Sequence, residues 1–174
     1  TSPHYFNLCE EDIEKWRTYA KVSPPLRNNK NMNAIKTAIL NNKIDCITSD
    51  HSPHDTDSKR LPFEQASSGV IGFESLLPLT LKLINDKKLP NKKLVELLSL
   101  HPSKILKLNS GTLKKRRPAD MILIDINKKI KLSSSLIKSK SNNFPYENIS
   151  GQGKIMLTIV DGKIVFNDRS FNIK

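Results

Sequence analysis

The 174-residue sequence predicts an α/β protein with two structural units, a mainly helical one over residues 1–108 and a strand-rich one over residues 109–174. Two observations carry this prediction. Up to about residue 108, apolar residues recur at helical spacing, and one short apolar run interrupts them. From about residue 111 onward, the chain has the pattern of short strands and turns. A chain of this length can bury the core of an ordinary domain.

In the first unit, we expect helices over residues 10–17, 31–42, 72–86, 91–100 and 102–108. The run from Lys43 to Asp50 is different, because it is short, β-branched and apolar. Those properties are typical of a buried parallel strand. The strand would end in polar residues, at Ser49 and Asp50.

In the second unit, residues 119–125 and 154–160 are strand-like, and residues 133–143 form a polar segment that we expect to be a loop. Asp161-Gly162, followed by the apolar residues 163–166, predicts a hairpin. A sheet made of these strands alone would be small. We therefore expect partner strands from a segment that precedes this chain.

Charge and hydropathy exclude two classes of partner. The formal net charge is +12, but the lysines are scattered, and the densest basic run, residues 114–117, has no interleaved aromatic residues. No window approaches the roughly 18 apolar residues of a membrane span. Cys9 and Cys46 are too few for a disulfide framework. We expect a cytoplasmic protein with reduced cysteines that binds neither nucleic acid nor a membrane.

Polar residues crowd together directly after the expected strand, in the motif Ser49-Asp50-His51-Ser52-Pro53-His54. In α/β barrels, the carboxyl ends of the strands carry the catalytic side chains, so an aspartate and two histidines there indicate chemistry. An alternative is that Asp50 caps a following turn or helix and that the histidines are loop residues. The motif alone leaves both interpretations open.

An ordered set of blocks spans almost the whole chain. In chain order they are Ser2-Pro3-His4, Ser23-Pro24-Pro25-Leu26-Arg27, Ile44–His54, Lys59, Gly69–Pro78, Gly111-Thr112-Leu113, Pro118-Ala119-Asp120, Ser139–Pro145 and Val160–Val165. Together they resemble the C-terminal portion of the dihydroorotases, which are cyclic amidohydrolases. The Asp-His-x-Pro-His block is shared in part with allantoinases, so it indicates the superfamily better than the substrate.

The resemblance implies a fold and a reaction. Residues 1–108 would be the C-terminal part of a TIM-type (β/α)8 barrel of the metal-dependent amidohydrolase kind. Residues 109–174 would supply C-terminal strands of a small β-sandwich domain. The parent enzyme would reversibly hydrolyse the cyclic amide of (S)-dihydroorotate to N-carbamoyl-L-aspartate, in pyrimidine biosynthesis, with one or two Zn²⁺ ions. Its partners would be this substrate, the missing N-terminal part and, in an oligomer, a second copy or a transcarbamoylase.

The resemblance also implies roles for single residues. Asp50 matches a metal ligand at the end of the eighth barrel strand, and would also carry a proton to the leaving nitrogen. His54 matches a histidine that contacts the substrate carboxylate, and the alternative is a histidine that packs within a turn. Ser68 and Gly69 stand where the family has a Pro-Gly pair against the substrate ring. Ser23 stands where many members carry an asparagine that binds substrate.

The family's other metal ligands, including a His-x-His pair, are missing from this sequence. Catalytic zinc normally needs three protein ligands. We therefore expect the 174 residues alone to be inactive and to bind zinc no better than a generic surface. Two other interpretations stay open for the parent protein: an allantoinase or hydantoinase, and a non-catalytic dihydroorotase-like subunit that supports a partner.

Overall fold

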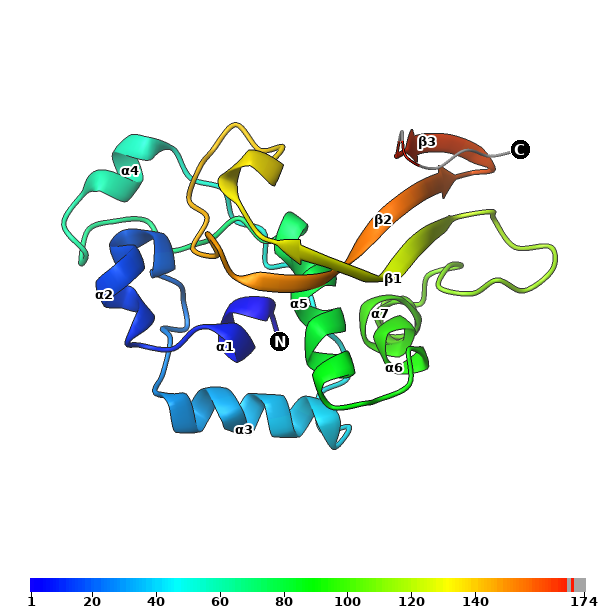
Figure 1. Ribbon diagram of the computed structural model, residues 1–174, viewed down its shortest axis with the longest axis horizontal. Helices are drawn as coiled ribbons and strands as arrows, with labels where there is room; N and C mark the ends of the chain where they lie inside the picture. The colour runs from blue at the N-terminus through cyan, green and yellow to red at the C-terminus, as the bar shows by residue number, and fades with distance from the viewer. Residues whose placement is uncertain (169, 171–174) are drawn as a thin grey trace.

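The computed structural model describes residues 1–168 and 170, which form helices followed by an antiparallel sheet (Figure 1). The α-helices are α1 (Pro3–Asn7), α2 (Asp12–Trp16), α3 (Asn29–Leu40), α4 (Thr56–Arg60), α5 (Phe73–Asp86), α6 (Lys92–Val95) and α7 (His101–Ile105). Short helical turns cover Arg17–Ala20 and Ser134–Leu136, and a π-helix over Glu96–Leu100 joins α6 to α7. The strands are β1 (Met121–Lys131), β2 (Ser150–Val160) and β3 (Lys163–Asn167).

Helix α5 packs against β2, and two glycines of the strand make this contact close. A Cβ atom at Gly151 would lie 2.7 Å from Cβ of Pro78, and one at Gly153 would lie 2.6 Å from Cδ2 of Leu81. Gly153 also has a φ of +95°, which side-chain-bearing residues rarely adopt. The sequence of β2 therefore lets the strand approach the helix more closely than larger residues would allow.

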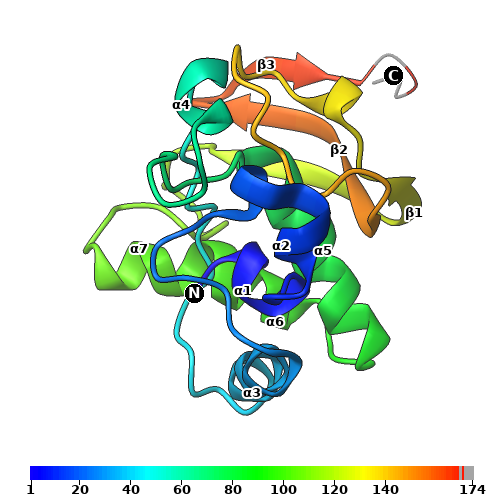
Figure 2. The ribbon, with the colours of Figure 1, turned by 90° about the vertical axis from the view of Figure 1, so that its left-hand side faces the viewer.

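One hydrophobic core contains residues from Phe6 to Tyr146. Its fully buried members include Phe6, Ile39, Ile71, Leu79, Leu81, Ile84, Leu97, Leu132 and Tyr146. Figure 2 shows helix α3 at the opposite end of the molecule from β3. Apolar side chains from the helices and from the segment between β1 and β2 belong to this one core.

The sheet has the order β1-β2-β3, and both pairs of strands are antiparallel. The expected hairpin is confirmed: Val160 pairs with Lys163, and Asp161 and Gly162 both have positive φ, as a two-residue hairpin turn requires. Every residue of β3 is exposed. The outer part of the sheet therefore extends beyond the core that α5 covers.

Most of the predicted helices are confirmed, but the predicted buried strand over residues 43–50 is wrong. Thr48 donates a backbone hydrogen bond to Thr1, and the N-terminal amine of Thr1 donates to Cys46, each bond spanning about 3 Å. In the described part of the chain, this pairing is too short to form a ladder, and only Ile47 is buried. The segment is extended but solvent-accessible. Helices α1 and α4 were not predicted, because Thr56–Arg60 contains no apolar residue and Pro3–Asn7 shows no helical repeat of apolar residues.

The contact between helix α5 and strand β2 leads to a first prediction. Leu81→Ala should lower the free energy of unfolding by about 2–5 kcal/mol, because Leu81 is fully buried and a cavity would remain beside Gly153. Leu106→Ala is the matched control, since Leu106 is 66% exposed and should change stability by about 0.5 kcal/mol or less. Urea unfolding followed by circular dichroism measures both. Equal effects of the two substitutions would contradict the proposed packing of α5.

Candidate active site

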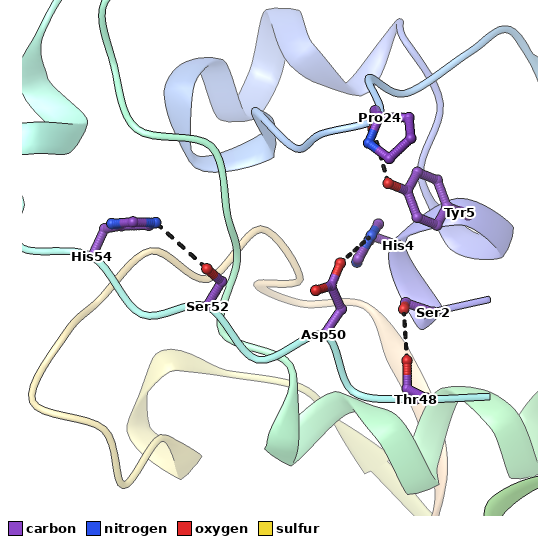
Figure 3. A network of polar contacts seen from close by, with 8 residues as sticks. All are labelled: Ser2, His4, Tyr5, Pro24, Thr48, Asp50, Ser52 and His54. Atoms are coloured by element: carbon purple, nitrogen blue, oxygen red, sulfur yellow. Dashed lines mark hydrogen bonds and ion pairs between the residues drawn. The ribbon is translucent and has the colours of Figure 1, made fainter. Parts of the chain in front are cut away.

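Asp50 lies at the end of the extended segment, with its carboxylate directed away from the backbone of that segment (Figure 3). Its side chain is 52% exposed. Its φ is +45°, in the left-handed region that non-glycine residues adopt at a cost, and aspartate is among the residues that tolerate it best. The backbone turn therefore presents a carboxylate to solvent at the position where the motif predicts chemistry.

Asp50 is not a helix cap. The aspartate that caps the next helix is Asp55, whose side chain accepts a hydrogen bond of 2.8 Å from the amide of Ser58 in helix α4. The capping role that the sequence left open for Asp50 thus belongs to Asp55, the residue directly after the motif. The carboxylate of Asp50 is left available for another role.

Asp50 has a buried imidazole beside it. His4, at the start of α1, is completely buried, and its Nε2 lies 3.4 Å from Oδ2 of Asp50. Burial lowers the pKa of His4 to about 4, although the Asp50 carboxylate opposes this shift. The imidazole is therefore neutral near pH 7, and the contact is one between a neutral ring and a carboxylate rather than a salt bridge. Sequence reasoning had assigned no role to His4.

The structure brings His54, Ser68 and Gly69 together. Nε2 of His54 lies 2.9 Å from the carbonyl oxygen of Ser68. Because a carbonyl only accepts hydrogen bonds, this nitrogen carries the proton. A Cβ atom at Gly69 would lie 2.6 Å from Oγ of Ser52, so the two segments approach each other closely at a residue without a side chain. A substrate carboxylate could accept a hydrogen bond from Nε2 of His54 only after the bond between His54 and the Ser68 carbonyl is broken.

Ser23 belongs to a neighbouring loop. Its side chain is exposed, and the peptide bond to Pro24 is cis. Two residues earlier, Lys21 accepts a hydrogen bond of 2.8 Å from the amide of Gly69. On the other side, the hydroxyl of Tyr5 donates to the carbonyl of Pro24 at 2.9 Å. The loop thus connects the Gly69 segment to the helix that carries His4.

Two buried polar residues support this region, and sequence reasoning had not singled out their roles. Lys59 is 1% exposed, and its ammonium donates to the carbonyls of Ser67 and Gly69 at 2.8 and 2.9 Å. Asn143 is fully buried and bonds to both the His54 segment and Gly69. In the sequence, both residues belong to the blocks that resemble the dihydroorotases: Lys59 is a block by itself, and Asn143 lies within Ser139–Pro145.

His51 takes no part in the exposed site. Its Nδ1 accepts a hydrogen bond from the amide of Gly72, and its ring stacks on Phe73 with the centroids 3.9 Å apart. These contacts fix the orientation of the His51 ring. Within the described part of the chain, no three His, Cys, Asp or Glu side chains gather in a way that could hold a metal ion. Asp50 and its surroundings in this chain therefore do not fit a complete zinc site.

With this geometry in place, comparison with known proteins identifies the family. Residues 6–165 match the amidohydrolase family. The chain belongs to the amidohydrolase family. Among residues 1–168 and 170, no helix of this amidohydrolase is both long enough and apolar enough to cross a membrane.

Curated relatives of this amidohydrolase chain are dihydroorotases. It is 40% identical over 169 residues to the dihydroorotase of Trichlorobacter lovleyi, which covers 97% of this chain and 40% of that protein. It is 42% identical over 165 residues to the dihydroorotase of Geotalea daltonii, covering 95% of this chain and 39% of that protein. The chain thus spans about 40% of the length of the relatives it matches.

Solved structures with the same fold are other amidohydrolases. L-hydantoinase from Arthrobacter aurescens is 28% identical, with a TM-score of 0.87 over 96% of this chain and 38% of that one. Dihydropyrimidinase from Brevibacillus agri has a TM-score of 0.89 over the same shares of both chains, at 21% identity. The second likeness concerns the fold alone. The arrangement of helices and sheet seen here is therefore that of part of these enzymes.

Lys59 leads to a prediction about pH. Burial, and to a lesser extent the ammonium of Lys21, lowers the pKa of Lys59 from 10.5 to about 8. Between these two values the unfolded chain holds a proton that the folded chain has released, so the free energy of unfolding should rise with pH across this window. Urea unfolding at pH 8, 9 and 10 measures this for the wild type and for Lys59→Met, which cannot titrate.

The wild type should gain stability relative to Lys59→Met as the pH rises from 8 to 10. Other lysines and tyrosines titrate in both proteins, so the difference between the two isolates Lys59. A constant difference across this range would mean that Lys59 keeps an ordinary pKa in the folded chain.

Proposed function

We propose that this chain is part of a dihydroorotase, which reversibly hydrolyses the cyclic amide of (S)-dihydroorotate to N-carbamoyl-L-aspartate. The observation that carries the proposal is the identity of about 40% to dihydroorotases over nearly the whole chain. We also propose that residues 1–108 belong to a TIM-type barrel, and residues 109–174 to a small β-sandwich. The exposed outer strand β3 supports the second assignment, because a sandwich would cover it.

Asp50 is the residue that we propose for the proton transfers. Amide hydrolysis needs a base for the attacking water and an acid for the leaving nitrogen, and one carboxylate can serve both steps in turn. Asp50 suits this role because its carboxylate is exposed while its backbone is held by a left-handed turn. The neutral ring of His4 lies against one oxygen, Oδ2, and thereby restricts the rotation of the carboxylate.

Asp50 is also the residue that we propose as a zinc ligand. A zinc ion would supply a Lewis acid that polarises the amide carbonyl. The described residues offer one carboxylate for this purpose, whereas three protein ligands are usual, so the remaining ligands would come from outside this chain. We propose that the chain contributes one side of the zinc site and the substrate contacts beside it.

His54, Ser68, Gly69 and Ser23 are the proposed substrate contacts. Their support is their proximity: His54 bonds to Ser68, and Gly69 bonds to the loop that carries Ser23. Both backbone groups of Gly69 are already bonded within the protein, so this residue would contact the ring through van der Waals packing. The anionic substrate would be bound where His54 can supply a proton-bearing nitrogen.

A hydantoinase is the second candidate, because the L-hydantoinase of Arthrobacter aurescens shares the fold at 28% identity. Hydantoin lacks the carboxylate of dihydroorotate. A protein that hydrolyses hydantoin but not dihydroorotate would favour this candidate. The higher identity to dihydroorotases is the reason we place it second.

The main test uses a chimeric enzyme, in which this chain replaces the region of the Geotalea daltonii dihydroorotase that it matches. The chimera should interconvert dihydroorotate and N-carbamoyl-L-aspartate. Asp50→Asn should lower kcat by about 10³-fold, because the amide cannot accept the proton. The measurement is the absorbance of dihydroorotate, with folding checked by circular dichroism.

Asp45→Asn is the control for Asp50→Asn, since Asp45 is an exposed carboxylate of the same extended segment. It should leave kcat within about twofold of the unmodified chimera. Near-normal turnover of Asp50→Asn would remove Asp50 from the mechanism. A folded chimera that leaves dihydroorotate unchanged would contradict the proposed reaction.

His54→Ala tests the substrate contact in the same chimera. It should raise KM for dihydroorotate by about tenfold, because a charge-assisted hydrogen bond to the substrate is lost. The matched control is His101→Ala, which also removes an imidazole bonded to a backbone carbonyl, that of Asp45. If both substitutions leave KM unchanged, His54 only packs within its turn.

A further inference from the structure

The buried side chain of Asn143 bonds to two segments of the candidate site at once. Its Oδ1 accepts a hydrogen bond of 3.2 Å from the amide of His54. Its Nδ2 donates to the carbonyl of Ser52 at 2.9 Å and to that of Gly69 at 3.0 Å. A carboxamide is the neutral side-chain group that can donate and accept in this way. Asn143 therefore connects the segment of His54 to the segment of Gly69.

The main chain of Asn143 adds a further bond, because its carbonyl accepts from the amide of Ile71 at 3.0 Å. Asn143 lies 89 residues after His54, in the segment that returns from β1 to β2. Its position is determined by the core: the next residue, Phe144, is buried, and its ring packs against Tyr146. The strand-rich part of the chain thus holds a polar group beneath the proposed substrate contacts.

Lys59 completes the arrangement from the other side. Its ammonium donates to the carbonyl of Ser67 and to the carbonyl of Gly69. The Gly69 carbonyl also accepts a hydrogen bond from Asn143. The carbonyl of Ser68, between them, accepts from His54. Three consecutive carbonyls of the Ser67–Gly69 segment are therefore held by buried or half-buried donors. This segment has little freedom to rotate its peptide groups.

We propose that Asn143 and Lys59 are positioning residues of the substrate site. They hold the backbone of the His54 and Gly69 segments in place, so that His54 can exchange its bond to Ser68 for a bond to the substrate. The inference rests on the proposed function. It assigns a role in substrate binding to the strand-rich part of the chain, which carries none of the residues that contact substrate in the proposal above. Neither residue bonds to Asp50, so substrate binding and proton transfer would be supported by different residues.

The test compares Asn143→Leu with Asn142→Leu. Leucine has nearly the shape of asparagine but cannot form hydrogen bonds, so the buried variant loses all three side-chain bonds of Asn143. Asn142 is the adjacent, exposed residue, whose side chain accepts one bond from Tyr19. Lys59→Met is the second test variant, and it decides the question if Asn143→Leu does not fold.

In the 174-residue chain, hydrogen–deuterium exchange should become at least tenfold faster over residues 51–56 and 69–72 in Asn143→Leu, with helix α5 unchanged. In the chimera, Asn143→Leu and Lys59→Met should raise KM for dihydroorotate about tenfold and leave kcat within about twofold. Asn142→Leu should change neither quantity. A purely structural role would lower the melting temperature of the variants without this selective effect on KM.

Two outcomes separate the inference from the proposed function. If the unmodified chimera turns over dihydroorotate and folded Asn143→Leu and Lys59→Met keep its KM, the positioning role is overturned and the proposed function stands. If the unmodified chimera folds but does not act on dihydroorotate, the proposed function fails and this inference fails with it. An increase in KM for both variants supports the positioning role.

Discussion

The close approach of strand β2 to helix α5 is the contact on which the candidate site depends. Gly151 and Gly153 let the strand lie directly on Pro78 and Leu81, where a Cβ atom would collide. Because the strand lies so near, the segment that precedes it enters the core with Phe144 and Tyr146 fully or almost fully buried. The position of strand β2 thus helps to place Asn143, whose side chain bonds to Ser52 and His54.

The electrostatics of the site follow from which groups are exposed. Asp50 keeps a solvent-accessible carboxylate, whereas His4 beside it is buried and neutral near pH 7. Lys59 is buried among backbone carbonyls, and its pKa is lowered because burial disfavours the charged form. The exposed carboxylate of Asp50 therefore lies beside a neutral ring rather than beside a charged partner. This environment is the one in which we propose that Asp50 binds metal and transfers protons.

Membership of the amidohydrolase family and an incomplete metal site are compatible. The chain spans about 40% of the length of its dihydroorotase relatives. At the end of the extended segment, the described residues provide one carboxylate, that of Asp50, and no cluster of three possible metal ligands. The backbone partners of residues 43–50 explain why the prediction of a buried strand there was wrong. A parallel strand needs hydrogen-bonded neighbours on its edges, and in the described part of the chain Thr1 is the main partner of this segment.

The sequence by itself determined the local features: the longer helices, the hairpin at Asp161-Gly162, the family and the position of Asp50. The helices and the hairpin depend on periodicity and turn chemistry, which act over a few residues, and the family depends on the order of short motifs along the chain. Only the tertiary structure decided that His4 lies against Asp50, and that Asn143 and Lys59 hold the His54 and Gly69 segments. These contacts join residues that are from 8 to 91 positions apart in the sequence, and several of the groups are buried. The packing of the core determines which residues form these contacts, and a local sequence pattern does not predict that packing.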